Sequence, residues 1–328
     1  MSEECDFVKQ REIELILKAA RLYYEENLSQ DQVASQLNTS RSNVSRMLTT
    51  ARTQGFVEIK IVAPLSRHET VAAQLKKLLG IKEVQVVSPS SNELALNAVG
   101  RAAASALISE LKPNQTIAVS WGRGLEATVL HCKKDTIPGL KITQLMGALS
   151  TVETSVTADD IGRTLARNLN AAFVPFNAPV VVSNQKIRNS LLEEGQISQV
   201  LDMARHANVA IVGIGSHASA SSEMVLDEFR LPEKERASIG AEYAGDIAAR
   251  FYNSAGKILN TAMDSRVIGI SLDELRKIPR VIGIANGTEK VLGVIGAARA
   301  KLVDSLVIDL ACANSILKYL SATEAVSA

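Results

Sequence analysis

Cysteines and long hydrophobic runs are scarce in this sequence. Its three cysteines, Cys5, Cys132 and Cys312, lie far apart without paired spacing, which argues against a disulfide framework and against a zinc site. No apolar stretch is long enough to cross a bilayer, and the polar N-terminus does not resemble a signal peptide. We therefore expect a cytoplasmic protein that does not enter membranes and holds no metal.

A surplus of charge is also missing. With 36 basic and 35 acidic residues the formal net charge is only +1, so the whole surface is not built to coat nucleic acid, although one local basic patch is compatible with this balance. A chain of 328 residues, 46% of them hydrophobic, suits a globular protein of two domains. Pro64 and the polar residues after it indicate a linker. We expect one domain over residues 1–61 and a larger one over residues 62–328.

The first sixty residues carry the pattern of three helices. Apolar residues recur at helical spacing over residues 8–26. Ser29 stands three residues before Gln32, the spacing of a capping box, which predicts a second helix ending near Leu37. Ser40 is a candidate N-cap for a third helix, whose buried stripe would consist of Val44, Met47, Leu48 and Ala51. The last two helices, joined by a tight turn, predict a helix-turn-helix.

The polar face of the third helix indicates DNA binding. With the apolar stripe turned inward, the arginines, serines and asparagine face outward, where a recognition helix meets bases and phosphates. Arginine can donate two hydrogen bonds to guanine, asparagine can pair with adenine, and serine suits phosphate oxygens. The expected DNA contacts are Ser40, Arg41, Ser42, Asn43, Ser45, Arg46 and Arg52. The alternative is a helical bundle with a solvated polar face.

The stretch FVEIKIV, residues 56–62, alternates apolar and polar residues after Gly55. This pattern predicts a strand pair or wing beside the helices. The first domain is therefore expected to be a winged helix-turn-helix.

The larger domain alternates strands and helices. A helix over residues 71–80, a strand over 83–88 and a helix from about 92 to 111 come first. Four later segments each pass from an apolar, β-branched strand through a turn into a helix: TIAVSWGRGLEATVL, VAIVGIGSHASA, RVIGIANGTEKVLGVIG and SLVIDLACANSIL. This alternation predicts a doubly wound, mostly parallel α/β domain, in which ligands bind at the carboxyl ends of the strands.

Two of the turns, at residues 122–127 and 213–218, match the dinucleotide-binding fingerprint with alanine in the last place. A nicotinamide-binding fold also needs an acidic residue at the end of the next strand, where LKITQLMG has Met146 and Gly147. The turns suit a phosphate group better, since backbone N–H groups at helix N-termini bind phosphate. Each glycine taken singly is also explained by a strand end or a positive φ. Nearby polar side chains are Ser120, Arg123 and Ser216.

Several segments resemble the SorC family of bacterial transcriptional regulators. Residues 15–61, LILKAARLYYEENLSQDQVASQLNTSRSNVSRMLTTARTQGFVEIKI, resemble the family's DNA-binding domain. SWGRGL is similar to its phosphate loop, GAEYAGDIAARFYNSAGKIL to the stretch whose aspartate faces the sugar, and residues 281–317 to its C-terminal signature. The resemblance covers nearly the whole chain. Two positions depart from the usual pattern, because Gly124 stands where threonine is common and Leu310 where an acidic residue is common.

The resemblance implies a sugar-binding effector domain with a fold like ribose-phosphate isomerases and glucosamine-phosphate deaminases. Family members bind phosphorylated sugars or polyols, which implies that Asp246 faces the sugar and Lys290 the phosphate. Some members hold their ligand through a lysine at the position of Met146; a thioether cannot form that bond, so binding here is expected to be non-covalent. The expected effector contacts are Ser120, Gly122, Arg123, Gly124, Gly213, Gly215, Ser216, Asp246, Gly287 and Lys290.

We therefore expect a DNA-binding regulator of a carbohydrate or nucleoside catabolic operon, controlled by a phosphorylated sugar. The alternatives are a sugar-phosphate isomerase-like enzyme and a nicotinamide-nucleotide-binding regulator. No motif combines a nucleophile, a base and an orienting partner, so no catalytic residue, enzyme activity or cofactor is expected. The expected partners are operator DNA and further copies of the chain, as a dimer or tetramer on a near-palindromic site. Asp246 has a second interpretation, as the N-cap of a helix after Gly245.

Overall fold

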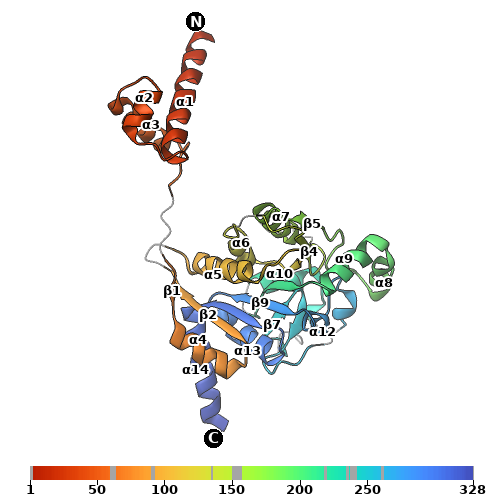
Figure 1. Cartoon of the computed structure of the whole chain (residues 1–328). Coiled ribbons are helices and arrows are strands. Elements are labelled where there is room, and N and C mark those ends of the chain that lie inside the picture. The colour runs from red at the N-terminus through yellow and green to blue at the C-terminus, as the bar shows by residue number, and fades with distance from the viewer. Residues whose placement is uncertain are drawn as a thin grey trace. The chain divides into compact units, whose positions relative to one another are not determined.

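The computed structural model describes residues 3–59, 64–89, 93–133, 136–149, 157–217, 220–233, 236, 242–259 and 262–327. The chain divides into two compact units, residues 1–63 and 64–328, which are described separately (Figure 1).

The N-terminal unit consists of three helices, α1 (Glu3–Tyr24), α2 (Gln30–Gln36) and α3 (Arg41–Thr53). Both predicted caps are confirmed. The Ser29 hydroxyl accepts from the Gln32 backbone N–H while the Gln32 side chain accepts from the Ser29 N–H, and the Ser40 hydroxyl accepts from the Asn43 N–H. The helices enclose a small core of Ile16, Ala19, Ala20, Leu22, Val33, Ala34, Val44, Leu48 and Ala51.

The wing prediction is wrong for the part of it that the structure describes. Residues 56–59 contain no strand, and residues 60–62 lie outside the described ranges. Gly55, with φ of 76°, turns the chain back, and the Val57 N–H donates to the Ala51 carbonyl at 3.0 Å while its side chain packs against the helical core. The segment therefore returns onto α3, and its alternating pattern reflects one half-buried valine.

The larger unit contains an eight-stranded sheet in the order β1-β2-β10-β9-β6-β3-β4-β5. Its strands are β1 (Ser66–Arg67), β2 (Glu83–Ser88), β3 (Thr116–Val119), β4 (Lys141–Gln144), β5 (Ala172–Phe173), β6 (Val209–Gly213), β9 (Arg280–Ala285) and β10 (Ser305–Asp309). All pair in parallel except the edge strand β1. The predicted parallel sheet is confirmed.

Helices cover both faces of this sheet (Figure 1). One face packs against α5 (Ala95–Glu110), α6 (Arg123–Val129) and α7 (Ala158–Leu169). The other packs against α4 (Glu69–Leu79), α9 (Gly195–Arg205), α10 (Ala220–Glu228), α12 (Leu272–Leu275), α13 (Val291–Arg299) and α14 (Leu310–Ser327). The short helix α8 (Gln185–Glu193) precedes α9 and buries no residue fully. The unit is thus doubly wound, as predicted.

The chain reverses direction across the sheet between β3 and β6. It runs outward from β3 to β4 and β5, then returns to β6 and continues to β9 and β10 on the other side. Consequently the chain leaves β3 toward α6 on one face and leaves β6 toward α10 on the opposite face. Such a switch point opens a crevice at the carboxyl ends of the strands, where ligands bind in open α/β sheets.

An antiparallel hairpin of β7 (Gly245–Ile247) and β8 (Arg250–Tyr252) lies outside the main sheet. Its second strand docks on α13, because the Tyr252 hydroxyl donates to the Gly293 carbonyl at 3.1 Å. Asp246 therefore lies within a strand, and its interpretation as a helix N-cap is wrong. A short polar sequence around a glycine is compatible with a strand and with a helix N-cap. The packing of the hairpin against α13 selects the strand in this protein.

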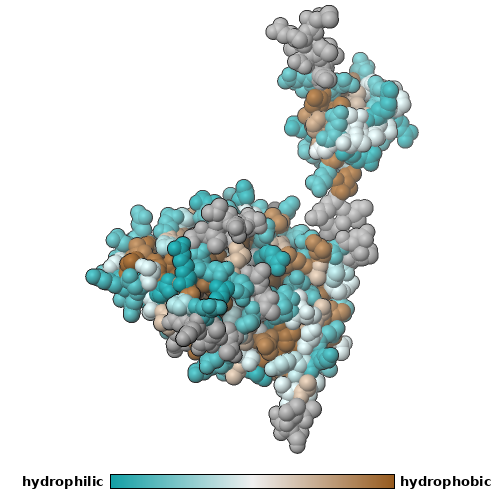
Figure 2. All heavy atoms as spheres, turned by 180° about the vertical axis from the view of Figure 1, so that it is seen from behind, coloured by the Kyte–Doolittle hydropathy of each residue, from teal (hydrophilic) through white to brown (hydrophobic). Residues whose placement is uncertain are grey.

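Exposed hydrophobic residues on the face drawn in Figure 2 lie in several separate patches between hydrophilic ones, as is normal for a protein surface. Among the described helices, none is both long enough and apolar enough to cross a membrane.

Candidate functional site

The N-terminal unit presents a basic face on α3, which carries three arginines and no acidic residue. Asp31 is a nearby carboxylate, 3.9 Å from Arg41 Nε, and both side chains are largely exposed, so solvent screens the pair. Six predicted DNA contacts are exposed and Asn43 is half-buried; the exposed ones are Ser40, Arg41, Ser42, Ser45, Arg46 and Arg52.

Several of these side chains already have partners at the start of α3. The Ser40 hydroxyl caps the helix, and Asn43 Nδ2 donates to Thr39 Oγ1 at 3.0 Å. The Arg46 guanidinium donates to Asn43 Oδ1, which leaves most of its five N–H donors unused. Arg46 therefore keeps donors free of the described residues on the exposed face of α3.

A cavity of about 400 Å³ opens in the larger unit at the carboxyl ends of β3, β6 and β9, beside the switch point. It is lined by Leu94, Ala95, Leu96, Ser120, Trp121, Gly122, Arg123, Gly124, Gly213, Ile214, Gly215, Ser222, Asp246, Ala248, Ile284, Ala285, Asn286 and Lys290. Eight of the ten predicted effector contacts line it. The two exceptions are Ser216, whose side chain is buried, and Gly287.

The turn after β3 supplies the first wall of the cavity. Gly122, with φ of 123°, ends the turn and precedes α6, where the backbone N–H groups of Arg123 and Gly124 donate to no described residue. Ile284 fills the space beside Gly124, because a Cβ there would lie 3.0 Å from its Cγ2. The glycine that stands where threonine is common thus packs against an isoleucine of β9.

The turn after β6 is different, because its backbone N–H groups are all used within the protein. Gly213 donates to Ser120 Oγ, and Ile214 donates to the Ile284 carbonyl. Gly215 donates to the Asp246 carbonyl and Ser216 to Ser222 Oγ. This turn therefore shapes the cavity wall, and its N–H groups have no capacity left for a phosphate.

Asp246 projects from β7 into the cavity wall and is almost fully buried. Ser222 Oγ donates to its Oδ1 at 2.5 Å. Burial raises the pKa of Asp246, while the hydrogen bond from Ser222 and the positive charge of Lys290 act in the opposite direction. The carboxyl group is thus buried, bonded to Ser222, and close to a cation.

The β7–β8 turn beside Asp246 is strained. Ala248 and Ala249 have φ of 52° and 60°, a region that costs an L-residue about 1–2 kcal/mol and that glycine occupies freely. Ala249→Gly should therefore raise the unfolding free energy by about 0.5–1 kcal/mol, since the strain relieved exceeds the entropy that glycine loses. Urea unfolding of the variant measures this change. A fall in the unfolding free energy by a similar amount, in place of the rise, would show that the turn is unstrained.

Lys290 ends the short 3₁₀ helix η2 (Thr288–Lys290) and is 9% exposed. Its Nζ forms no hydrogen bond or ion pair with a described residue. Burial lowers the pKa of Lys290, and the negative charges of Asp246 and Glu289 oppose that shift whereas Arg123 reinforces it. A buried ammonium without a direct partner is costly, and two neighbouring cations at one end of a cavity create a place for an anion.

Gly287 has a structural role instead of a place in the cavity wall. Its N–H donates to Asp309 Oδ1 at 2.8 Å, which links the turn after β9 to the end of β10. Its φ of 101° lies in the region that glycine adopts and that L side chains rarely do. Gly287 and Asp309 together set the path of the chain into Lys290.

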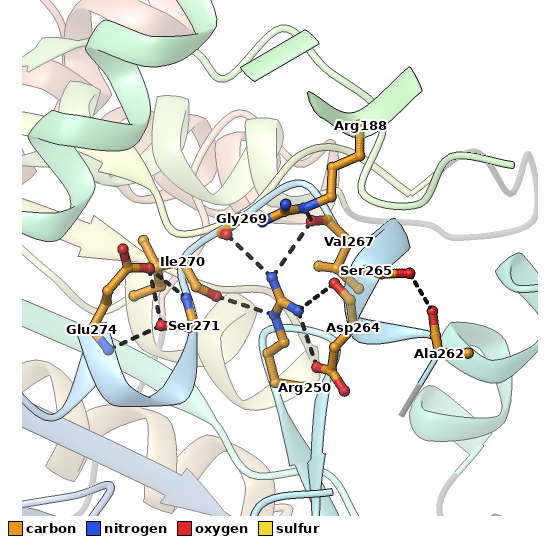
Figure 3. A network of polar contacts seen from close by, with 10 residues as sticks. All are labelled: Arg188, Arg250, Ala262, Asp264, Ser265, Val267, Gly269, Ile270, Ser271 and Glu274. Atoms are coloured by element: carbon orange, nitrogen blue, oxygen red, sulfur yellow. Dashed lines mark hydrogen bonds and ion pairs between the residues drawn. The ribbon is translucent and has the colours of Figure 1, made fainter. Parts of the chain in front are cut away.

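Arg250, on β8, fastens the hairpin to the segment over residues 264–271 (Figure 3). Its side chain is 6% exposed. Its guanidinium donates to the Asp264 carboxylate at 3.0 Å and carbonyl at 2.8 Å, and to the Ile270 carbonyl at 3.3 Å. The hairpin that carries Asp246 is therefore fixed to residues 264–271 by a buried cation.

Several cavity residues carried no signal that could be recognised in the sequence. Ser222 lies on α10 and meets Asp246 across 24 positions of the chain, and Leu94 to Leu96 reach the cavity from the start of α5. Asn286 was the exception, since it belongs to the ANG turn after β9. Among the described residues no group of three histidine, cysteine, aspartate or glutamate side chains could hold a metal ion.

Residues 64–318 match the protein family described as "Putative sugar-binding domain". The chain is 30% identical over 312 residues to the Sorbitol operon regulator of Klebsiella pneumoniae, covering 94% of this chain and 98% of that protein. It is 28% identical over 309 residues to the Deoxyribonucleoside regulator of Bacillus subtilis, with coverage of 94% and 98%.

The fold also matches the solved structure of a regulator. The full-length Sorbitol Operon Regulator SorC from Klebsiella pneumoniae superimposes with a TM-score of 0.71 and 29% identity, over 93% of this chain and 99% of that chain. These relatives are named as regulators, not as enzymes.

Proposed function

Because this chain belongs to the SorC family of transcriptional regulators, with a sugar-binding domain, we propose that it binds operator DNA through α3 and that a phosphorylated sugar in the cavity controls this binding. The regulated genes would serve catabolism of a carbohydrate or nucleoside. The observation that carries the proposal is the buried Lys290, which has no direct partner among the described residues and lies near the oppositely charged Asp246 at a switch-point cavity.

The proposed ligand position follows from the charges of the cavity. The phosphate lies at Lys290 and Arg123, where the unused N–H groups of Arg123 and Gly124 also point to an anion. The hydroxyl groups of the sugar lie toward Asp246 and Asn286. Met146 is fully buried and cannot form a Schiff base, so the ligand is held without a covalent bond.

The proposed domain division follows the two compact units, residues 1–63 for DNA and 64–328 for the effector. One helix-turn-helix reads too few bases for genomic specificity. We therefore propose a dimer or tetramer on a near-palindromic operator, in which the effector shifts the equilibrium between two arrangements of the DNA-binding units.

A thermal-shift screen of the full chain tests the effector. A ligand that binds only the folded state raises the melting temperature by mass action. We expect a rise with one phosphorylated sugar and no rise with its unphosphorylated form. Nicotinamide nucleotides belong in the same screen, and a rise with them alone would contradict the proposal.

Arg46→Ala tests the DNA-binding face. Loss of a bidentate base contact is expected to weaken operator binding by about 1–3 kcal/mol and to relax specificity at one base pair. The measurement is fluorescence anisotropy with a duplex selected from random DNA by the full chain.

Arg21→Ala is the matched control, since Arg21 is an exposed arginine of the same unit on α1. It should change operator affinity less than Arg46→Ala and leave base preference intact. Equal affinity of the Arg46→Ala variant and the unmodified protein would remove Arg46 from the interface.

A further inference from the structure

Three polar side chains form a line from the turn before α3 into that helix. Thr39, Asn43 and Arg46 follow one another at spacings of four and three residues, which bring side chains together on a helix. Asn43 Nδ2 donates to Thr39 Oγ1 at 3.0 Å, and Arg46 Nη2 donates to Asn43 Oδ1. The asparagine therefore joins the turn to an arginine in the next turn of the helix.

The donors and acceptors of this line fix the orientation of the asparagine amide. A guanidinium can only donate, so the atom that faces Arg46 is the amide oxygen, and the NH2 group faces Thr39. The Thr39 backbone N–H donates to the Ala34 carbonyl of α2 at 2.9 Å. Because Ala34 belongs to the core of the N-terminal unit, the line starts from a fixed point.

The same orientation makes Asn43 a poor reader of adenine. An asparagine that recognises adenine places both its oxygen and its NH2 group at the edge of the base. In this protein the two ends of the amide point along α3 in opposite directions, one to Arg46 and the other to Thr39. The adenine contact expected from the sequence would therefore cost both of these hydrogen bonds.

Arg46 lies on the side of α3 opposite the core. At about 3.6 residues per turn, Ser42 and Arg46 project away from the buried Val44 and Leu48, and both are exposed. Asn43 lies at the flank of this outward face and is half-buried. Arg46 thus has a place from which a recognition helix reaches base edges, and Asn43 a place from which it supports the arginine.

One complete edge of the Arg46 guanidinium stays available. A guanidinium has two edges that can each donate a pair of parallel hydrogen bonds, and the two hydrogens of Nη2 belong to different edges. The bond to Asn43 uses one of them, and Arg46 forms no other hydrogen bond with the described residues. The remaining edge matches guanine, the base that offers two acceptors, N7 and O6, in the major groove.

The other two arginines of α3 are held less firmly. Arg41 Nε lies 3.9 Å from an oxygen of the exposed Asp31, and Arg52 Nη2 reaches Thr49 Oγ1 only at 3.4 Å. An arginine side chain has many rotamers to lose when it binds, and one that is already held loses fewer. Arg46 is therefore the arginine of this helix that the protein prepares in advance.

We propose that Asn43 and Thr39 are positioning residues, which hold the Arg46 guanidinium for a contact with guanine, and that Asn43 does not itself read a base. The inference rests on the proposed function, because it requires that α3 binds operator DNA. It makes guanine the base opposite Arg46 in each half of the operator.

The test uses the full chain and a duplex that this chain selects from random DNA, with affinity measured by fluorescence anisotropy. Each guanine of the selected site is replaced in turn by 7-deazaguanine, which keeps its base pairing and lacks the N7 acceptor. We expect one replacement in each half of the site to weaken binding about tenfold. The same replacement should change binding of the Arg46→Ala variant less than twofold, because this variant lacks the donor.

Asn43→Ala should weaken binding of the selected duplex about fivefold and lower the 7-deazaguanine penalty to about threefold, since a mobile guanidinium must be ordered on binding. In the Arg46→Ala background the same change should cost less than twofold, because Asn43 acts through Arg46. A loss that persists in this background contradicts the proposal. So does a dependence on adenine N7, probed with 7-deazaadenine, that disappears with Asn43→Ala.

Two substitutions of Thr39 form a matched pair. Thr39→Val keeps the shape of the side chain and removes the hydroxyl acceptor, whereas Thr39→Ser keeps the hydroxyl. The valine variant should lower the 7-deazaguanine penalty as Asn43→Ala does, and the serine variant should keep the penalty within twofold of the unmodified protein. If Thr39 only stabilises the turn, Thr39→Val weakens binding to every duplex by the same factor and leaves the penalty unchanged, which would rule out the positioning role.

The salt dependence separates this inference from the proposed function. If Arg46 binds a phosphate, Arg46→Ala weakens all duplexes equally and lowers the slope of log affinity against log salt by about one. That outcome would overturn the inference and leave the proposed function standing. If the unmodified protein selects no duplex and binds all sequences equally, the proposed function fails, and this inference fails with it.

Discussion

Arg250→Leu is expected to reduce the unfolding free energy of the effector unit by about 3–5 kcal/mol. Arginine at this position donates to the carboxylate and carbonyl of Asp264 and to the Ile270 carbonyl, and more distantly to the carbonyls of Val267 and Gly269 (Figure 3). Leucine fills the space but satisfies none of these oxygens. Each buried acceptor left without a partner costs about 1–3 kcal/mol, which is more than the hydrogen bond itself contributes.

Urea unfolding followed by Trp121 fluorescence measures this loss in the effector unit alone, since Trp121 lies in its cavity wall. Arg163→Leu is the control. Arg163 pairs with Asp159 and lies over the Phe173 ring on the exposed surface of α7, where solvent screens the ion pair, so its loss should be much smaller. Similar losses for the two variants would show that the Arg250 network contributes no more than a surface pair.

Lys290→Ala is expected to weaken effector binding by about 2–5 kcal/mol, because it removes a buried, charge-assisted hydrogen-bond donor from an anion. DNA binding without effector should be retained, since the helix-turn-helix lies in the other unit. Calorimetry with the sugar phosphate found by thermal shift measures the first effect, and anisotropy with operator DNA measures the second. An undiminished response to the effector would move the phosphate away from Lys290.

The pH dependence of binding gives this prediction a second readout. Burial lowers the pKa of Lys290 below that of an ordinary lysine, and an anion binds the protonated form. Affinity should therefore be highest below this pKa and fall as pH rises through it, at a lower pH than a surface lysine would give. Lys290→Ala should lack this alkaline fall, whereas Lys318→Ala, which changes an exposed lysine of α14, should keep it.

Lys290 and Asp246 make the cavity a source of lower folding stability as long as no ligand is bound. The ligand-free protein keeps a buried ammonium and a buried carboxyl near each other without a direct bond between them. Such groups reduce stability in the absence of ligand. Binding of a hydroxylated anion would satisfy both, which supports a tight coupling between effector binding and the folded structure of the cavity.

The local elements of this protein were determined by its sequence. Ser29 with Gln32 and Ser40 set the starts of two helices through contacts only three residues apart, and β-branched runs followed by small residues marked the parallel strands. These features depend on near neighbours in the chain, so a pattern can predict them. The glycine turns at the strand ends predicted the edge of the sheet at which the cavity opens.

Only the tertiary structure decided which polar groups face the cavity. The glycine turn after β6 has its N–H groups bonded to Ser120, Ile284, Asp246 and Ser222. The N–H groups that the sequence pattern assigned to phosphate therefore hold the cavity wall together. Asp246 lies in a strand because the hairpin docks on α13, and the bond from Ser222 spans a segment that no local pattern connects. These outcomes depend on long-range hydrogen bonds and burial, and a buried polar group takes its role from whichever distant partner satisfies it.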